Sequence, residues 1–154
     1  MLSIEFFIKF KNTLLNCSLS HSRKTSSKLF IKSSNQVLLK SDREQISRVF
    51  LNLIKNSIES INQKGEKSNN FNKKITIELH QNNNQITLII TDNGIGFVNF
   101  NENIRNVLNP YITTKKSGTG LGLSIVNKTV NDHNGKIEFI PIKDGAKIKI
   151  IFLK

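Results

Sequence analysis

The sequence predicts an α+β two-layer sandwich, in which helices cover one face of a mixed, largely antiparallel sheet. Two segments have the apolar periodicity of amphipathic helices and four have that of strands, in the order helix, strand, strand, helix, strand, strand. The chain has 154 residues, of which 37% are hydrophobic. This length supports one domain with a substantial core and is too short for two domains of ordinary size.

The first helix is expected over residues 44–61. Its apolar side chains recur at the 3.6-residue spacing of a helix that buries one face. Either Ser41 or Asp42 suits the N-cap position, since both side chains accept hydrogen bonds from free backbone N–H groups. The Asn-rich segment 62–74 and the Ser- and Lys-rich segment 18–28 lack periodicity and are expected to be irregular. The apolar positions are Ile46, Val49, Phe50, Leu53, Ile54, Ile58 and Ile61.

The strands come in two pairs. Residues 75–79 alternate apolar and polar side chains, and residues 85–91 are expected to pair with them across an Asn-rich turn. The second pair, residues 136–142 and 147–153, is joined by a turn that contains Asp144-Gly145. Each pair therefore predicts an antiparallel hairpin.

A second helix is expected over residues 121–133, with Leu123, Val126 and Val130 facing the core. Asn134-Gly135 follows directly and is a helix stop signal, because these two residue types adopt the left-handed backbone conformation most easily. About twenty residues before this helix show no periodicity and are expected to form a long irregular loop.

The chain is basic, with 23 Lys and Arg against 11 Asp and Glu and a net charge of +12. Lysine supplies 19 of these cations, and Asn (21), Ile (22) and Lys together make up 62 of the 154 residues. All three have A/T-rich codons, whereas nucleic-acid binding proteins cluster their charge and favour Arg for bidentate contacts. Codon bias therefore explains the charge better than direct nucleic-acid binding, which is the weaker alternative.

Cysteine content and the length of apolar runs limit the class of protein. Cys17 is the single cysteine, so no internal disulfide is possible, which fits a reducing compartment. The longest apolar runs have about five to seven residues, against the roughly 20 that a membrane-spanning helix needs. We therefore expect a cytoplasmic domain without a membrane segment, even if its parent protein is membrane-anchored.

Three groups of residues have the chemistry of a ligand site. In the first, Asn52 and Asn56 lie four residues apart on one edge of the first helix. Amide oxygens suit a Mg²⁺ ion that also binds phosphate and water. In an Asn-rich chain, a solvent-facing pair is the simpler alternative.

The second group, Asp92-Asn93-Gly94-Ile95-Gly96, directly follows a predicted strand. A carboxylate at a strand end can accept a hydrogen bond from an exocyclic amine such as that of adenine. Gly94 and Gly96 allow the backbone to approach a ligand closely. An ordinary turn is the alternative, but the long irregular loop that follows favours a functional segment.

The third group, Gly118-Thr119-Gly120-Leu121-Gly122-Leu123, opens the second helix. Free N–H groups and the positive end of the helix dipole make a phosphate site at such a position. Lys115 and Lys116 add positive charge just before it. The spacing differs from both the Walker A and the Rossmann glycine patterns.

Together these segments resemble the N, G1, F and G2 boxes of the GHKL ATP-binding superfamily, and within it the sensor histidine kinases. The N box corresponds to residues 48–61, the G1 box to 91–97 and the F and G2 boxes to 109–126. The stretch 37–50 matches the strand and helix start that precede the N box. Glu59 and the Pro-Tyr-x-Thr-Thr-Lys form of the F box are most similar to the NtrY-like, nitrogen-regulation group.

This resemblance implies the Bergerat (GHKL) fold, with ATP and Mg²⁺ as cofactors. Asn56 would coordinate the metal, Asn52 would line the phosphate side, and Lys115 would contact phosphate. Asp92 would hold the adenine amine, and residues 97–117 would form the ATP lid. The implied nucleotide-binding residues are Asp92, Gly94, Gly96, Gly118, Thr119, Gly120, Leu121 and Gly122.

The resemblance also implies the reaction. Hydrolytic members of the superfamily carry a Glu as general base one turn before the magnesium Asn, where this chain has Asn52, which cannot take a proton. This favours phosphoryl transfer from ATP to a histidine, so the chain is expected to be the catalytic domain of a protein-histidine kinase. His21 lies among serines and lacks the neighbouring carboxylate of a phosphoacceptor. The acceptor is therefore expected on a separate dimerisation domain, in cis or in trans, with a response regulator as an indirect partner.

Residues 37–154 are thus expected to form the catalytic domain, and residues 1–36 a connecting segment, the remnant of a linker or dimerisation helix. Such a domain would not be self-sufficient, because it carries no suitable acceptor histidine. The alternative is a degenerate GHKL module that acts only through protein–protein contacts. The intact N, G1 and G2 boxes argue against that alternative.

Overall fold

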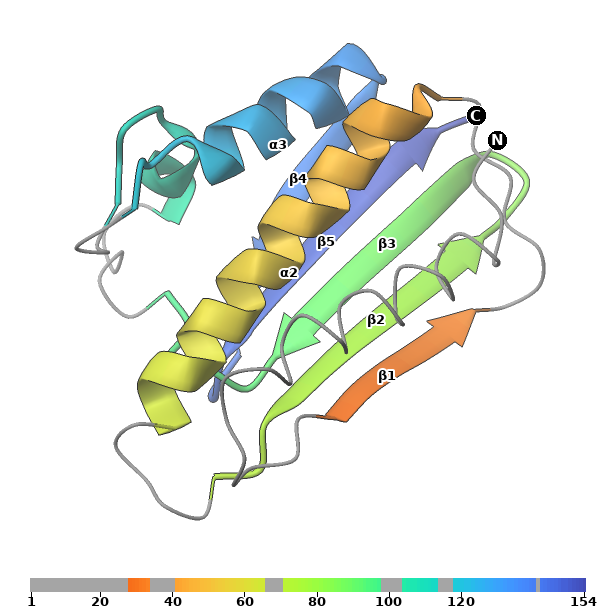
Figure 1. The fold of residues 1–154 in the computed structure, drawn as a ribbon. Helices are drawn as coiled ribbons and strands as arrows, with labels where there is room; N and C mark the ends of the chain where they lie inside the picture. Colours follow the sequence, from red (N-terminus) through yellow and green to blue (C-terminus); the bar gives the residue numbers. More distant parts are fainter. Residues whose placement is uncertain (1–27, 34–40, 66–70, 98–103, 114–117, 141) are drawn as a thin grey trace.

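A computed structural model describes residues 28–33, 41–65, 71–97, 104–113, 118–140 and 142–154. In this part of the chain, two helices cover one face of a mixed sheet (Figure 1). The predicted α+β two-layer sandwich is confirmed.

The sheet has the strand order β1-β2-β3-β5-β4. β1 runs parallel to β2, whereas β2–β3, β3–β5 and β4–β5 are antiparallel. The two predicted hairpins are β2–β3 and β4–β5, and the β3–β5 pairing joins them, with Asp92 opposite Ala146. The strands are β1 Lys28–Ser33, β2 Lys74–Gln81, β3 Gln85–Asp92, β4 Gly135–Ile140 and β5 Ala146–Leu153.

β1 departs most from the sequence-based expectations. Lys28 belongs to the segment expected to be irregular, yet it begins a strand that pairs with β2, with Leu29 opposite Ile75. β1 also precedes residue 37, where the domain was expected to begin. The strand expected just after residue 37 lies outside the described residues. A six-residue edge strand has too little periodicity to be recognised without its distant partner.

The first helix, α2, spans Arg43–Gly65 and continues past its expected end at residue 61. Asp42 is its N-cap, since Oδ1 of Asp42 accepts hydrogen bonds from the N–H of Glu44 at 2.8 Å and of Gln45 at 3.2 Å. The last turn, expected to be a loop, packs through Lys64, whose ammonium lies 5.2 Å from the centre of the Phe71 ring.

The second helix, α3, spans Gly122–Asp132. Val126 and Val130 are fully buried, as expected, and Leu123 packs against the core. Asn134 takes the left-handed conformation after the helix, with φ of 52°, whereas Gly135 already belongs to β4. A Cβ at Gly135 would lie 2.8 Å from the carbonyl oxygen of Ile151, so the second residue of the stop signal is a packing glycine.

The core lies between the sheet and the two helices. Part of the segment expected to be irregular is ordered: η2, a 3-10 helix at Ile104–Leu108, lies beside α3 (Figure 1). Val107 of η2 is buried, and this burial stabilises the 3-10 helix in its place. No helix in the described part of the chain is long and apolar enough to cross a membrane. The largest fully buried side chains include Ile46, Leu53, Ile54, Ile77, Leu88, Ile90, Val126, Val130 and Ile150.

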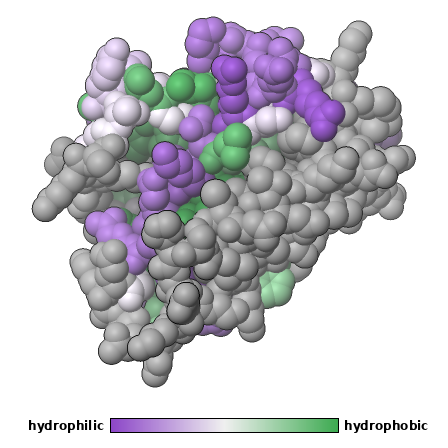
Figure 2. Space-filling view, viewed as in Figure 1, coloured by the Kyte–Doolittle hydropathy of each residue, from purple (hydrophilic) through white to green (hydrophobic). Residues whose placement is uncertain are grey.

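Part of the surface around α3 and η2 is apolar. In Figure 2, hydrophobic residues reach the surface over these elements, and hydrophilic residues gather where α2 begins. The exposed side chains include Leu51 on α2, Ile125 on α3, and Tyr111 and Ile112 after η2.

Candidate functional site

The three predicted residue groups meet along one side of α2. Asn52 lies beside the start of α3, Ser57 is hydrogen-bonded to Asp92 at the end of β3, and Ser60 contacts the residues that follow β3. At 1.5 Å per residue, the distance from Asn52 to Ser60 along the helix is about 12 Å. α2 therefore provides one wall that borders all three groups.

Asp92 is a buried carboxylate at one end of this wall, with only 5% of its surface exposed. Its Oδ1 accepts a hydrogen bond from the N–H of Gly94 at 2.9 Å, and the Ser57 hydroxyl and the Ala146 N–H also donate to the carboxylate. Burial raises the pKa of Asp92, and these hydrogen bonds and the ammonium of Lys64 partly offset the rise. A buried carboxylate with a raised pKa is typical of a functional site.

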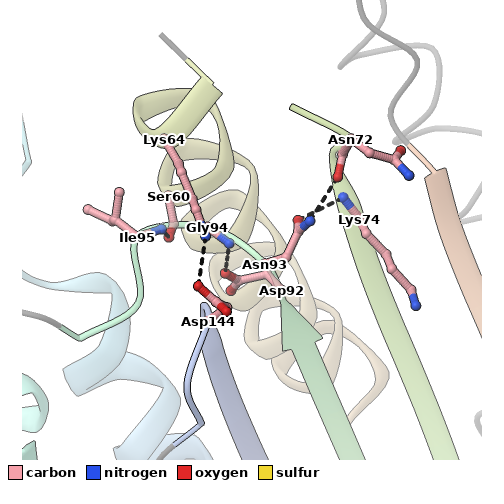
Figure 3. Close-up of polar contacts among 9 residues, drawn as sticks. All are labelled: Ser60, Lys64, Asn72, Lys74, Asp92, Asn93, Gly94, Ile95 and Asp144. Atoms are coloured by element: carbon pink, nitrogen blue, oxygen red, sulfur yellow. Dashed lines mark hydrogen bonds and ion pairs between the residues drawn. The ribbon is translucent and has the colours of Figure 1, made fainter. Parts of the chain in front are cut away.

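Asn93 ties the segment after β3 to the start of β2. Its side-chain oxygen accepts a hydrogen bond from the N–H of Lys74 at 2.9 Å, and its amide donates to the carbonyl of Asn72 at 2.8 Å (Figure 3). Asp92 therefore precedes a residue that is fixed to the neighbouring strand, rather than a loosely held turn.

Gly94 and Ile95 lie directly against α2. The N–H of Ile95 points at Ser60, with its nitrogen 3.0 Å from Oγ and 3.3 Å from the carbonyl oxygen (Figure 3). A Cβ at Gly94 would lie 2.2 Å from Oγ of Ser60. The segment can approach the helix this closely only because residue 94 has no side chain.

The turn between β4 and β5 closes the same end of the site. Gly96, with φ of 69°, lies against the carbonyl of Gly145, and Gly145 in turn lies against the carbonyl of Asp92. Asp144 pairs with Lys64 of α2 at 3.6 Å (Figure 3). Three segments that are distant in sequence thus converge on Asp92.

The glycine-rich segment forms the other end of the site. Leu121 is the N-cap residue of α3, and no side chain caps this helix. Asn52 lies next to Gly122, because a Cβ at Gly122 would be 3.6 Å from Oδ1 of Asn52. Oγ1 of Thr119 accepts a hydrogen bond from the N–H of Leu121 at 3.4 Å. A helix N-terminus without a side-chain cap attracts anions.

The remaining predicted site residues are placed as follows. Asn56 is half-buried on α2, one turn after Asn52, and Gly118, Gly120 and Leu121 are half-buried before α3. Lys115 lies outside the described residues. Within the described ranges, no group of three or more His, Cys, Asp and Glu side chains could hold a metal ion.

Four residues of the site are not predicted by the sequence patterns: Ser57, Ser60, Lys64 and Asp144. A signal existed for Ser57, which lies four residues from both Leu53 and Ile61, on the buried face of α2. A polar residue at such a position needs a partner. Lys64 and Asp144 had no local signal, because their pairing depends on how the β4–β5 turn meets the end of α2.

Comparison with known proteins identifies this arrangement. Residues 41–154 match the family described as histidine kinase-, DNA gyrase B- and HSP90-like ATPase. The chain belongs to this family. The expected similarity to the nitrogen-regulation group of sensor histidine kinases is confirmed as well. The chain is 37% identical over 106 residues to the sensory histidine kinase/phosphatase NtrB of Azospirillum brasilense, and 38% identical over 112 residues to an NtrY-like sensor histidine kinase of Rickettsia conorii.

The fold agrees with that of a solved catalytic domain. The catalytic domain of the histidine kinase ThkA, in a nucleotide-free form, superposes with a TM-score of 0.72 and 25% identity over 97% of this chain and 90% of that one. The matched region covers 64% of this chain but 26% of the NtrB relative, and 72% of this chain but 17% of the NtrY-like relative. The chain thus corresponds to the ATP-binding catalytic domain of much longer sensor kinases.

Proposed function

We propose that the chain binds ATP with Mg²⁺ and transfers the γ-phosphoryl group to a histidine on a separate domain. The buried carboxylate of Asp92 carries this proposal. It lies at one end of the α2 wall, and the α3 N-terminus, which no side chain caps, lies at the other. The base would bind at Asp92 and the phosphates at Gly118–Gly122, with Lys115 as a further phosphate contact and residues 97–117 as the lid.

Asn56 is the proposed protein ligand of the metal. Mg²⁺ keeps several waters and is commonly bound by one or two protein oxygens together with substrate phosphates. The amides of Asn52 and Asn56 suit this role, since both are half-buried on the wall that leads to α3. Bound Mg²⁺ would neutralise phosphate charge, while the chain's own residues orient the nucleotide.

The first prediction is that a non-hydrolysable ATP analogue binds with a Kd at or below the millimolar range, in a magnesium-dependent way. Removal of the metal with a chelator should weaken binding by about tenfold or more, because the phosphates then lose their counter-charge. Isothermal titration calorimetry measures both values. Absence of magnesium-dependent binding at millimolar nucleotide would refute the proposed function.

A matched variant locates the metal. Asn56→Asp keeps the side-chain shape but adds a negative charge beside the phosphates, so we expect altered magnesium dependence with an unchanged melting temperature. Asn62→Asp, at an exposed position on the same helix, is the control for added charge and should leave binding as it is.

Phosphoryl transfer would require a partner that carries the acceptor histidine. His80 is exposed on β2 beside Glu78, and His133 follows α3 at the end remote from Gly122. Neither lies at the phosphate end of the site. The exposed apolar residues Leu51 and Ile125 are on the two helices that border that end and offer a contact surface for a dimerisation domain.

The second prediction concerns labelling with γ-labelled ATP. The chain alone should acquire no acid-labile, base-stable phosphate, because orientation of an acceptor by docking supplies much of the rate of such a reaction. Adding the purified dimerisation domain of an NtrB-type relative should give label on that domain. Label on the chain itself, mapped to His21, would show that the acceptor lies in this chain.

A non-catalytic interaction module is the second candidate, because the apolar surface exists whether or not ATP is turned over. That function would leave the chain able to dock on a kinase but unable to support transfer. The labelling experiment separates the two.

A further inference from the structure

β4 is the last strand of the sheet in the described part of the chain (Figure 1). It pairs with β5 in an unbroken antiparallel register, from Gly135 opposite Phe152 to Ile140 opposite Lys147. Its outer backbone N–H and C=O groups therefore have no strand partner among the described residues. A regular edge of this kind is a template on which a further strand can pair.

The apolar side chains of β4 are less buried than those of its neighbour. Ile137 and Phe139 pack against the core, yet both are partly exposed, and no residue of β4 is fully buried. On β5, by contrast, the apolar residues Ile148, Ile150 and Phe152 on the helix side of the sheet are all buried. A strand added next to β4 would cover the apolar surface that is still exposed.

The other face of β4 carries one cation and one anion, two residues apart. Nζ of Lys136 lies 2.8 Å from Oε1 of Glu138, and Nζ of Lys149 on β5 lies 3.5 Å from Oε2 of the same carboxylate. The hydrogen bond from Lys136 and the charges of both lysines lower the pKa of Glu138, so this carboxyl is ionised at neutral pH. The side chain of Lys136 is 71% exposed.

The order of these charges suits antiparallel pairing of β4 with a second copy of itself. If Ile137 lies opposite Ile137 of the second copy, Lys136 of each copy lies opposite Glu138 of the other. Centring the pairing on Lys136 or on Glu138 instead would put like charges directly opposite each other, which is unfavourable. The register centred on Ile137 also places the small Gly135 opposite the large Phe139.

We propose that β4 is a homodimer interface, at which two copies of the chain join their sheets edge to edge about a two-fold axis at Ile137. A lysine on an edge strand normally opposes pairing, but here Lys136 meets an anion across the axis and specifies the register. The interface lies on β4, whereas the proposed ATP site lies along α2. The inference therefore does not rest on the proposed function.

The first test measures the mass of the full chain in solution by analytical ultracentrifugation. The mass should rise from 17.5 kDa toward twice that value between about 10 µM and 1 mM, because a single strand pair is a small interface. Glu138→Lys alone and Lys136→Glu alone both place like charges opposite each other, and each should weaken dimerisation by about tenfold or more. An equimolar mixture of the two variants restores opposite charges and should form a heterodimer.

A disulfide tests the register without a change of charge. With Cys17→Ser to remove the single native thiol, Ile137→Cys should place two thiols opposite each other across the axis. Opposite Cα atoms in an antiparallel pair are about 4.5–5.5 Å apart, which a disulfide can span, so mild oxidation should cross-link most of the protein as a dimer. Ile140→Cys is the control, since it is also partly exposed on β4 but would lie about 20 Å from its counterpart.

Three results would overturn the inference. One is a mass of 17.5 kDa at every concentration, and another is a dimer that both charge variants form as well as the wild type does. The third is equal cross-linking through positions 137 and 140. If a charge variant fails to fold, as judged by its melting temperature, the disulfide experiment still decides. None of these results bears on magnesium-dependent nucleotide binding, which is measured separately.

Discussion

Asp92→Asn is expected to weaken ATP binding by about 10- to 150-fold. A hydrogen bond to a charged group contributes about 1.5–3 kcal/mol, and the substitution removes the charge and replaces one acceptor oxygen by a donor. The preference for adenine over unsubstituted purine should disappear with it. Calorimetric titration of both nucleotides against wild type and variant measures the loss.

The same substitution should change how stability depends on pH. Because burial raises the pKa of Asp92, the folded state binds the proton more tightly than the unfolded chain. The contribution of Asp92 to stability therefore falls as pH rises from the ordinary pKa of this carboxyl, 3.8, to its raised pKa in the folded state. A neutral Asn lacks this dependence, so the melting temperature of the variant, relative to that of the wild type, should rise over the same pH range.

Asp42→Asn is the matched control. Asp42 is exposed at the start of α2, and hydrogen bonds from the N–H groups of Gln45 and Glu44 lower its pKa. The folded state favours the ionised form of Asp42, so its contribution to stability changes with pH in the opposite direction. This contribution is lost as pH falls through the lowered pKa. Nucleotide affinity should be unchanged in this variant. A stable Asp92→Asn protein that binds ATP normally would remove Asp92 from the site.

Local patterns were sufficient to predict most of the fold. The 3.6-residue spacing that places Ile46, Leu53 and Ile61 on one face of α2 is a property of the helix alone, as is the alternation in β2 and β5. Asp92 and Gly94 could likewise be predicted as a ligand segment, since they directly follow a strand and precede a long loop.

The missed features depend on contacts between distant segments. β1 is held by its register with β2, and no pattern within residues 28–33 specifies that pairing. Ser57 lies on the predicted helix, but the carboxylate beside it belongs to Asp92, 35 positions later in the sequence. Lys64 and Asp144 meet only because the β4–β5 turn reaches the end of α2. Such contacts follow from the assembled layers, whereas the sequence pattern indicates only which residues face inward.

Gly145→Ala should cause the largest loss of stability among the single substitutions considered. Gly145 has φ of 99°, a conformation that costs an L-residue about 1–2 kcal/mol. A Cβ there would also lie 1.9 Å from the carbonyl oxygen of Asp92 and 2.7 Å from its carbonyl carbon. Overpacking typically costs a further 1–3 kcal/mol. The sum, about 2–5 kcal/mol, should lower the melting temperature by roughly 5–15 °C.

Gly145→Ala should also weaken nucleotide binding, because the β4–β5 turn must move away from Asp92 and Gly96, which it contacts directly. Gly65→Ala at the end of α2 is the control, since its Cβ would meet the end of the flexible Lys73 side chain at 3.2 Å and the Phe71 ring at an ordinary contact distance of 3.6 Å. Ala is the better helix former by about 1 kcal/mol, so this variant should be at least as stable as the wild type and bind ATP normally. Thermal melting and titration of the two variants side by side test both effects. Equal melting temperatures would mean that the turn between β4 and β5 does not lie against Asp92.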